Sequence, residues 1–322
     1  MSKKVKNQPV YLTDYNKDDA KWDHHKSSTD VISFYYASSA KHSKYSVRMD
    51  SCAELLRFQF IDNLATGEAE LKLNKAQFCR VRLCPVCQWR RSMAWRARLF
   101  QNLPLLFAEK PNLSFIFLTL TVKNCPVTSL AETLKEMNKA WQKLIDRKAF
   151  KKAVKGFIRA TEVTKSGELA HPHFHCILAV NKSYFRTKDY IKSAKWAELW
   201  QDCLKVDYLP VVDARKIRQK GDQIELKAVL ETLKYTTKIE HLIEDKDWFL
   251  ELSDQLFKKR FIATGGCFKD VLKEEVSNEE MIKGEQNEEF DLEEEQEKLK
   301  KSLFFGFDHG VKKYKKVKNP HG

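Results

Sequence analysis

Apolar residues recur along the chain with two periods, and these periods predict the elements of the main domain. Runs of β-branched and aromatic residues predict buried strands, and these runs cover Phe115–Val122, Gly156–Thr164, His171–Val180 and Leu209–Ile217. Apolar residues at helical spacing predict helices. One opens at a capping box, Ser129–Glu132, and the others cover Tyr190–Leu204 and Leu226–Ile239.

The order of these elements predicts an α+β fold. The order β-α-β-β-α-β, followed by a further helix, is typical of a ferredoxin-like split βαβ unit with an antiparallel sheet. We expect helices on one face of the sheet and a free face for a substrate. Composition divides the 322 residues into four parts. They are a mobile basic arm (1–45), a small N-terminal zinc-binding module rich in cysteine (46–100), the main domain (101–272) and a tail that is first acidic and then basic (273–322).

Charge is distributed unevenly along the chain. The net charge is +14 and the pI is about 9.2, yet residues 274–297 contain twelve acidic residues and one lysine. This stretch carries −11, which leaves +25 for the rest and favours a nucleic-acid partner. No apolar run reaches the ~18–20 residues of a membrane span, and the N-terminus lacks the apolar region of a signal peptide. We therefore expect a cytoplasmic protein with no membrane partner.

Three histidines alternate along one predicted strand. His171, His173 and His175 share a face because alternate strand residues point the same way. A turn near Gly167 makes this strand and the preceding one a hairpin, which places Glu162 opposite His173, at about 5 Å. Two imidazoles and a carboxylate suit a divalent ion, and beside nucleic acid we expect Mn²⁺ or Mg²⁺. His171, at the start of the strand, is expected to contact phosphate.

One face of the last predicted helix gathers reactive groups. Lys227, Glu231, Lys234, Tyr235 and Lys238 fall at spacings that share a helical face. A tyrosine flanked by lysines and facing a metal is a candidate nucleophile, because nearby positive charge helps a phenol of pKa ~10 to ionise. We expect Tyr235 to be that nucleophile, with Lys234 and Lys238 as the supporting cations.

Four cysteines have the spacing of a zinc site. Cys79-x4-Cys84-Pro-Val-Cys87 is similar to a zinc knuckle, and Cys52 lies 27 residues upstream. Four thiolates around a structural Zn²⁺ are expected; the alternative is a thioredoxin-like redox pair at Cys84 and Cys87, although no βαβ pattern surrounds it. Neighbouring arginines are expected to present a basic surface to DNA. They are Arg80, Arg82, Arg90 and Arg91.

Three motifs, in a fixed order, resemble those of a known family. They are the strand Phe117–Asn124 with its Thr-Leu-Thr, Glu162-Val-Thr ahead of His173-Phe-His175, and Glu231-Thr-Leu-Lys-Tyr235-Thr-Thr-Lys238. Together they resemble the HUH-endonuclease replication initiators, or Rep proteins, of small rolling-circle plasmids from Gram-positive bacteria, in particular those with a single catalytic tyrosine. The resemblance covers roughly residues 50–272, and the cysteine segment 78–91 and Gly265-Gly266 also look like this family.

The resemblance implies origin-specific, metal-dependent nicking and strand transfer. Tyr235 would attack the scissile phosphate at the metal held by His173, His175 and Glu162, stay linked to the 5′ phosphate and free a 3′-OH that primes synthesis. Single-tyrosine initiators similar to this chain use a glutamate, here Glu231, to activate water for the terminating cleavage. The implied partners are the double-strand origin of the plasmid, a host helicase and a second copy of the chain on DNA.

Two other functions fit part of the pattern. A mobilisation relaxase or an HUH transposase would use the same chemistry, but relaxases usually place the tyrosine before the histidine motif, and such transposases are shorter and lack the cysteine module. A zinc-containing DNA-binding regulator without catalysis would explain the charge and the cysteines. That function leaves the histidines, Glu231 and Tyr235 without a role.

Overall fold

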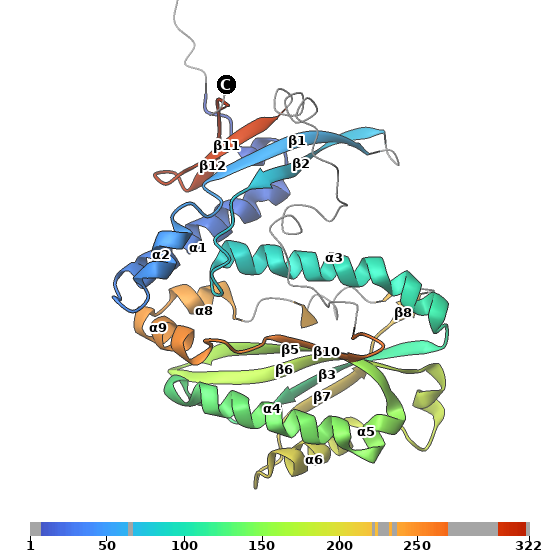
Figure 1. The fold of residues 1–322 in the computed structure, drawn as a ribbon. Coiled ribbons are helices and arrows are strands. Elements are labelled where there is room, and N and C mark those ends of the chain that lie inside the picture. The colour runs from blue at the N-terminus through green and yellow to red at the C-terminus, as the bar shows by residue number, and fades with distance from the viewer. Residues whose placement is uncertain are drawn as a thin grey trace, which may run out of the picture. The chain divides into compact units, whose positions relative to one another are not determined.

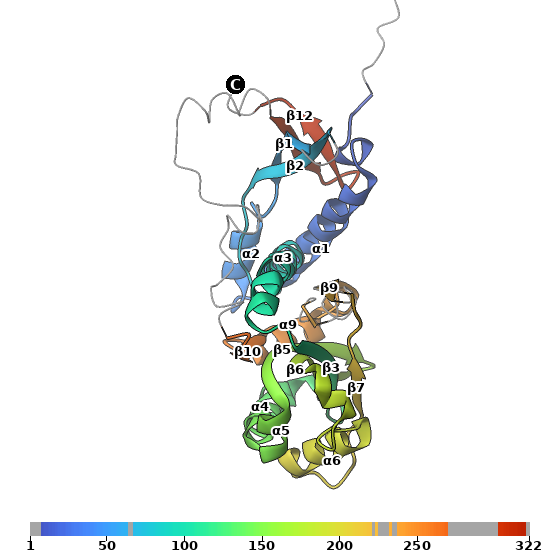
Figure 2. The same cartoon turned by 90° about the vertical axis from the view of Figure 1, so that its right-hand side faces the viewer.

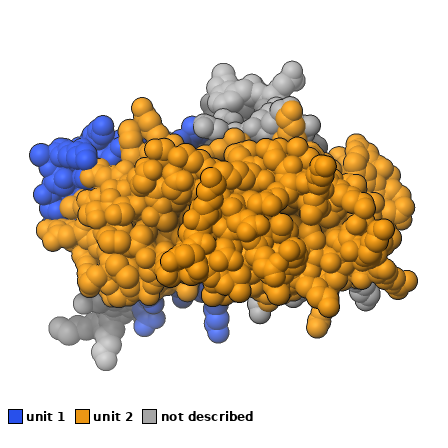
Figure 3. All heavy atoms as spheres, turned by 90° about the horizontal axis from the view of Figure 1, so that it is seen from below, with its two compact units in different colours: residues 1–91, 276–322 blue, residues 92–275 orange. Residues whose placement is uncertain are grey.

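The computed structural model describes residues 8–63, 67–220, 223–224, 232–233, 237–269 and 302–319. The chain divides into two compact units, unit 1 (1–91 and 276–322) and unit 2 (92–275), which Figure 3 shows in different colours. Both units combine helices with antiparallel sheets. This confirms the mixed α and β composition predicted from the two hydrophobic periods.

The sheet of unit 2 contains the hairpin predicted from the turn near Gly167. Its strands are β3 (Leu113–Thr121), β4 (Cys125–Pro126), β5 (Val154–Ser166), β6 (Leu169–Asn181), β7 (Val212–Lys216) and β10 (Ile262–Gly266). The order across the sheet is β10-β5-β6-β3-β7, with β4 beside β6. β6 therefore separates β3 from β5, and both of its faces are buried, which is why its sequence is apolar almost throughout.

Three helices cover one face of this sheet (Figures 1 and 2). They are α4 (Leu130–Asp146), α5 (Lys148–Ala153) and α6 (Ser193–Leu204), preceded by the 3-10 turns η3 (Val127–Ser129) and η4 (Lys182–Arg186). Trp141, Trp196 and Trp200 are buried among them. The predicted capping box is wrong in detail: Ser129 is the N-cap residue of α4, but its side chain makes no capping bond. The Ala131 N–H donates instead to the side chain of Gln255, at 2.8 Å.

The opposite face was expected to be free, and this prediction is wrong for part of it. The helix α3 (Pro85–Glu109) covers that part. Leu99, Leu103, Leu106 and Phe107 form an apolar stripe at helical spacing along its second half. This stripe packs in one core with Phe115 and Phe117 of β3 and with Ile177 and Ala179 of β6. Those β6 residues continue the row of His171, His173 and His175, so the covered part of the face lies beyond the histidines.

The predicted last helix does not run to Ile239. Leu233 lies in a turn, Thr237 in a bend, and Lys238 is extended (φ −64°, ψ 140°) before a new helix, α8 (Ile239–Ile243), begins. Lys238 therefore does not continue the helical face predicted for Tyr235. Thr236 and Thr237 are β-branched and favour a helix weakly, which accounts for the break. The other residues predicted for that face, Lys227, Glu231, Lys234 and Tyr235, lie outside the described residues.

Unit 2 ends with a helix and a strand. α9 (Lys246–Gln255) begins at Asp245, whose carboxylate accepts the N–H groups of Asp247 and Trp248. β10 then pairs with β5. Gly266 has φ +59°, and a Cβ there would stand 2.2 Å from the Lys155 carbonyl oxygen, so only glycine fits. Two further short strands, β8 (Gln219–Lys220) and β9 (Gln223–Ile224), pair with each other.

Unit 1 joins the two ends of the sequence. Its elements are η1 (Leu12–Asp14), η2 (Lys17–Asp19), α1 (Ala20–Ala37), α2 (Ser43–Met49), β1 (Leu55–Asn63), β2 (Glu68–Ala76), β11 (Leu303–Asp308) and β12 (Lys313–Val317). The strand order is β12-β11-β1-β2. Trp22 and Tyr36 of α1 are buried, as are Phe305 of β11 and Tyr314 of β12.

Unit 1 overturns two of the predicted boundaries. Residues 1–45 are not a mobile arm over the described part, because they include α1, a helix of eighteen residues that buries Trp22, Ile32 and Tyr36. Residues 302–319 are not a tail, because β11 pairs with β1 and β12 with β11. The cysteine module predicted over 46–100 is correspondingly divided at Arg91 between the two units. The acidic stretch 274–297 lies outside the described residues. None of the described helices is long and apolar enough to span a membrane.

Candidate functional site

The hairpin of β5 and β6 brings a carboxylate onto two imidazoles. Glu162 pairs with His173, as the turn near Gly167 predicted, and Ala160 pairs with His175. The Glu162 Oε2 lies 3.0 Å from His173 Nε2 and 2.8 Å from His175 Nε2. All three side chains are buried. Glu162, His173 and His175, called here the acid–histidine cluster, are one of two sets of metal-type ligands that converge among the described residues.

The hydrogen bonds behind the imidazoles favour a cation in this cluster. His173 Nδ1 lies 3.2 Å from the carbonyl oxygen of His171, and because a carbonyl only accepts, Nδ1 carries the proton. A neutral His173 then presents the lone pair of Nε2 to the carboxylate oxygen. Two lone pairs at 3.0 Å repel unless a positive charge stands between them or the ring is protonated. A divalent ion meets that requirement, so the donor set fits a metal.

Residues of β3 and the chain after it support the cluster from one side. Thr119 pairs with His175 across the sheet, and its Oγ1 lies 3.2 Å from His175 Nδ1. That contact orients the ring so that Nε2 faces Glu162. Sequence analysis assigned Thr119 to the motif strand but gave it no role. His171 stands apart from the cluster: its Nδ1 lies 2.6 Å from Asn124 Oδ1, and burial lowers its pKa.

A loop with exposed apolar side chains adjoins the same end of β3. The hydroxyl of Thr121, which pairs with His173, donates to the Val211 carbonyl oxygen at 2.8 Å. The side chain of Val211 is 76% exposed and that of Leu209 is 59% exposed. Lys123 stacks over the Tyr208 ring at 4.2 Å. Sequence analysis missed this loop because the apolar run was assigned to a strand from Leu209; the strand begins at Val212.

The segment of the predicted nucleophile is described only at its flanks. Leu233 is buried in the core formed by α3 and the sheet, on the face that carries the histidines. Thr237 is also buried, whereas Lys238 is exposed. Tyr235 stands midway between Leu233 and Thr237 in the sequence, and Tyr235, Glu231 and Lys234 lie outside the described residues. Their catalytic roles stay predictions.

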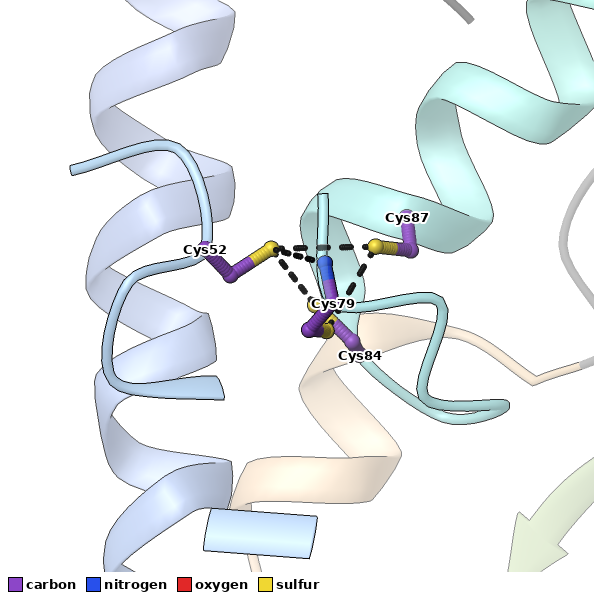
Figure 4. Close-up of side chains that lie close together, drawn as sticks. All are labelled: Cys52, Cys79, Cys84 and Cys87. Carbon is purple, nitrogen blue, oxygen red and sulfur yellow. Dashed lines mark hydrogen bonds between the residues drawn. The ribbon is translucent and has the colours of Figure 1, made fainter. Parts of the chain in front are cut away.

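The four predicted zinc ligands converge within unit 1 (Figure 4). Cys52 follows α2, Cys79 follows β2, Cys84 directly precedes α3, and Cys87 lies in its first turn. The Cys52 Sγ lies 3.7 Å from the Sγ atom of Cys84 and 3.7 Å from that of Cys87. The Sγ atoms of Cys79 and Cys87 are 3.6 Å apart. Sulfurs bound tetrahedrally at 2.3 Å from zinc are about 3.8 Å apart. This four-cysteine cluster therefore fits zinc, and its thiols are free rather than paired in disulfides.

The surroundings of the four-cysteine cluster favour one thiolate, at Cys84, whereas the pKa values of the buried Cys52 and Cys87 thiols are raised. Backbone N–H groups of Cys79, Arg80 and Val81 point at the sulfurs of Cys52, Cys87 and Cys79, at 3.3–3.4 Å. Burial alone would raise the pKa of the Cys84 thiol, but hydrogen bonds from the other three cysteines hold that pKa well below its usual range. Because a thiolate is the form that binds metal, Cys84 is prepared for it.

The four arginines predicted to face DNA occupy different environments. Arg80 is exposed and has φ +56°, which aims its backbone N–H at the Cys87 sulfur. Arg90 stacks over Trp22 and Trp89, and burial lowers its pKa to about 10. Arg82 and Arg91 are half-buried. Arg90 thus contributes to packing, and DNA binding by this set stays a prediction.

Comparison with known proteins identifies the family. The Rep_1 model, described as replication protein, matches residues 70–315. The chain belongs to this family. Three relatives are each named Protein rep. That of Streptococcus pneumoniae serotype 2 (strain D39 / NCTC 7466) is 34% identical over 285 residues, 86% of this chain and 87% of the relative. That of a Bacillus species is 38% identical over 266 residues, covering 74% and 81%. That of Lactiplantibacillus plantarum is 37% identical over 247 residues, covering 72% and 76%.

The family match agrees with the residues described above. It confirms the resemblance to plasmid replication initiators that the three motifs carried. Residues 70–315 include the whole acid–histidine cluster and Cys79, Cys84 and Cys87, and they extend through β11 into β12. No solved structure matches this chain significantly. The site geometry therefore rests on this structure and its own residues.

Proposed function

We propose that this replication protein nicks one strand of its plasmid origin with Tyr235, at a divalent metal held by the acid–histidine cluster. The convergence of Glu162, His173 and His175 carries the proposal, because three metal-type ligands converge at the end of a rigid hairpin. The donor set of two imidazoles and one carboxylate leaves coordination positions for phosphate oxygens. The antiparallel sheet with β6 between β3 and β5 supports an HUH-endonuclease fold.

The metal, Mn²⁺ or Mg²⁺, supplies a Lewis acid that draws electron density from the scissile phosphate. The chain's own residues do the rest. Thr119 keeps His175 oriented, and the His171 carbonyl fixes the tautomer of His173. The Nε2 atoms of both rings then face Glu162, in position to coordinate the metal.

Tyr235 would be the nucleophile of a balanced transesterification. Its phenol oxygen bonds to phosphorus, the bond from phosphorus to the 3′ oxygen breaks, and that oxygen takes up a proton to become the 3′-OH primer. The phenol proton passes to solvent, which positive charge on the neighbouring Lys234 would favour. Because phenol has a pKa near 10, a 3′-OH can later displace it and rejoin the strand. Leu233, two residues before Tyr235, packs on the histidine face of the sheet, which favours an approach of the tyrosine from that side.

Glu231 would end the replication cycle. It stands one helical turn before Tyr235 in the sequence, and as a general base it would take a proton from the water that performs the terminating cleavage. Hydrolysis then leaves no covalent link with which to restart. Origin DNA is the partner that this scheme requires, and a host helicase and a second copy of the chain remain predicted partners.

The four-cysteine cluster would hold a structural Zn²⁺ rather than a redox pair. Four buried sulfurs at about the spacing of a tetrahedral zinc site support this assignment. A redox-active pair needs only two thiols and access to a partner, whereas these four are buried.

The test uses supercoiled plasmid that carries the gene's own replicon. Protein is added with Mn²⁺, Mg²⁺ or EDTA, and products are run on denaturing gels with and without protease. We expect metal-dependent nicking with DNA covalently attached to the wild-type protein. Tyr235→Phe should lower nicking at least about 10⁴-fold, since the nucleophile is lost.

The matched control is Tyr190→Phe, the same substitution at a tyrosine that is 42% exposed and outside the site. It should nick like wild type. Full nicking by Tyr235→Phe would refute the assigned nucleophile. Origin binding by the wild type without any nicking would refute the enzyme and favour a regulator.

A further inference from the structure

A second candidate site lies in unit 2, at the end of β6 remote from the histidines. It is a cavity of about 620 Å³ lined by Ser114, Lys182, Ser183, Phe185, Arg186, Thr187 and Lys216. Three of these residues are cations, three carry hydroxyls and none is acidic. A cavity with this lining selects for an anion, and its oxygen-binding donors match a phosphate.

Two of the cations are available to a ligand. Arg186 and Lys216 are exposed and form no ion pair with any described residue. Lys216 stacks over the Phe185 ring at 4.7 Å, which holds its ammonium group at the cavity. Lys182 is already engaged in part, since it donates to the Pro111 carbonyl oxygen at 2.8 Å.

The Ser114 hydroxyl gives an independent sign of a ligand. Ser114 is 1% exposed, and its Oγ is buried without a hydrogen-bond partner among the described residues. A buried hydroxyl left unpaired destabilises a fold, so a bound species that accepts its proton would remove that cost. Ser114 lines the cavity beside Lys216, and a phosphate oxygen there would accept its proton.

The position of the cavity separates it from the proposed nick. Ser114 pairs with Val180 of β6. His173 of the acid–histidine cluster lies seven residues before Val180 on the same strand. Seven strand residues span about 23 Å, the length of about seven base pairs of B-form DNA. Ser114 alternates with Phe115 on β3, so the cavity opens on the helix-covered face, opposite to the histidines.

Basic residues continue around the sheet between the two faces. β7 is the last strand in the order on this side and carries Arg215 and Lys216 in succession. Arg215 stacks over Phe117, which belongs to the histidine face, whereas Lys216 reaches Phe185 at the cavity. DNA that passes from the histidine face around β7 to the cavity would meet Arg215 on the first face and Lys216 on the second.

We propose that this cavity binds backbone phosphates of origin DNA outside the nicked dinucleotide. The inference rests on the proposed function only in taking DNA as the ligand. In this proposal Arg186, Lys216 and the Ser114 hydroxyl donate hydrogen bonds to phosphate oxygens, and Phe185 positions Lys216. It predicts a DNA contact that short substrates lack.

The test compares two substrates with the nick site at the centre. In one the duplex arms have three base pairs, about 10 Å, and in the other twelve, about 40 Å. Arg186→Ala/Lys216→Ala should bind the long substrate about tenfold more weakly, and its slope of log affinity against log salt should fall by about two. Nicking and binding of the short substrate should match wild type. Lys188→Ala/Lys192→Ala, at two exposed lysines outside the cavity lining, removes the same number of charges and should change neither.

Ser114→Ala separates a ligand group from a structural one. If the hydroxyl serves DNA, the Tm stays the same or rises while affinity for the long substrate falls by several-fold. A lowered Tm with unchanged affinity would overturn the role of Ser114. Unchanged affinity and salt slope in Arg186→Ala/Lys216→Ala would overturn the DNA site as a whole.

Two further arms distinguish the source of the phosphate and the dependence on catalysis. Isothermal titration with inorganic phosphate and with a deoxynucleoside triphosphate tests free anions. Tight binding of either, lost in the double variant while long-substrate affinity persists, would assign the cavity to a small molecule and refute a DNA contact. Binding is measured without metal, so it remains interpretable even if wild-type protein fails to nick.

Discussion

The two metal-type clusters of this protein are assembled in different ways. The four-cysteine cluster draws its sulfurs from three separated stretches of chain, at Cys52, at Cys79 and at the start of α3. The acid–histidine cluster takes all its ligands from one hairpin, at Glu162 and, eleven and thirteen residues later, at His173 and His175.

This is the difference that we expect between a structural site and a reactive one. Four sulfurs complete the coordination of zinc, so a metal there can tie distant segments together but has no position for a substrate. Three ligands on a rigid hairpin leave positions open and need little help from a metal to stay in place. The folded state should thus depend on the first cluster, and activity on the second.

The largest effect should follow from opening the four-cysteine cluster. Cys84→Ser removes the thiol with the lowered pKa, and binding of structural zinc contributes about 10 kcal/mol to folding in small zinc domains. We expect loss of one equivalent of zinc by elemental analysis and rapid proteolysis within residues 8–91. Cys203→Ser, at a buried cysteine outside the cluster, should keep the zinc. Retained zinc in Cys84→Ser would remove the distinction between the clusters.

The acid–histidine cluster should behave in the opposite way. Glu162→Gln keeps the shape of the side chain but removes its charge, and we expect metal-dependent nicking to fall at least about 10³-fold, roughly 4 kcal/mol. The Tm in EDTA should stay the same or rise, because a buried carboxylate has been neutralised. Glu168→Gln, on the turn of the same hairpin, is the control. A large loss of Tm in Glu162→Gln would mean that this cluster also holds the fold.

The pH dependence of stability should distinguish the units. Burial lowers the pKa of His25 to about 3, whereas an unfolded histidine titrates near 6.5. Below pH 6.5 the unfolded chain binds a proton that folded unit 1 does not, so stability falls as pH falls, by about 2 kcal/mol at pH 5. Urea melts between pH 7 and 5 should show this slope, and His25→Gln should reduce it. An unchanged slope in His25→Gln would refute the assignment.

The smallest effect should come from the support of the histidines. Thr119→Val has nearly the same shape but removes the hydroxyl that contacts His175 Nδ1, and loss of such a partner behind a metal ligand weakens metal binding about tenfold. Isothermal titration with Mn²⁺ would measure it. Thr133→Val, at a half-buried threonine of α4 outside the cluster, should leave the affinity unchanged.

Sequence alone predicted the sheet of unit 2 and both clusters. The periodicity of β3, β5 and β6 is strong because these strands are buried, and the turn at Gly167 fixed the register that places Glu162 opposite His173. The cysteines were equally visible, since their spacing is unusual. Local pattern was sufficient wherever an element is buried or its ligands lie close in sequence.

The same reasoning failed for unit 1. α1 buries His25, Lys26, Ser28 and Thr29 beside Trp22, so its polar and apolar residues do not separate into faces. In β12 only Tyr314 is buried, and its neighbours are lysines, so the sequence of this strand was interpreted as a basic tail. Its place is set by pairing with β11, and that of β11 by pairing with β1, some 250 residues earlier. Periodicity within a short segment of sequence does not predict contacts between residues so far apart in the chain.

The pairing of β1 with β11 has a consequence for how the protein is made. The ribosome completes β1 about 240 residues before it reaches Leu303, an interval of roughly 12–50 s at 5–20 residues per second. During that time Phe58 lacks the neighbour Phe305, against which its ring packs edge-on at 5.7 Å. A chain stopped short of Leu303 would leave this sheet half formed. The segment from Leu303 onward is therefore needed to complete unit 1, whatever the state of the acid–histidine cluster.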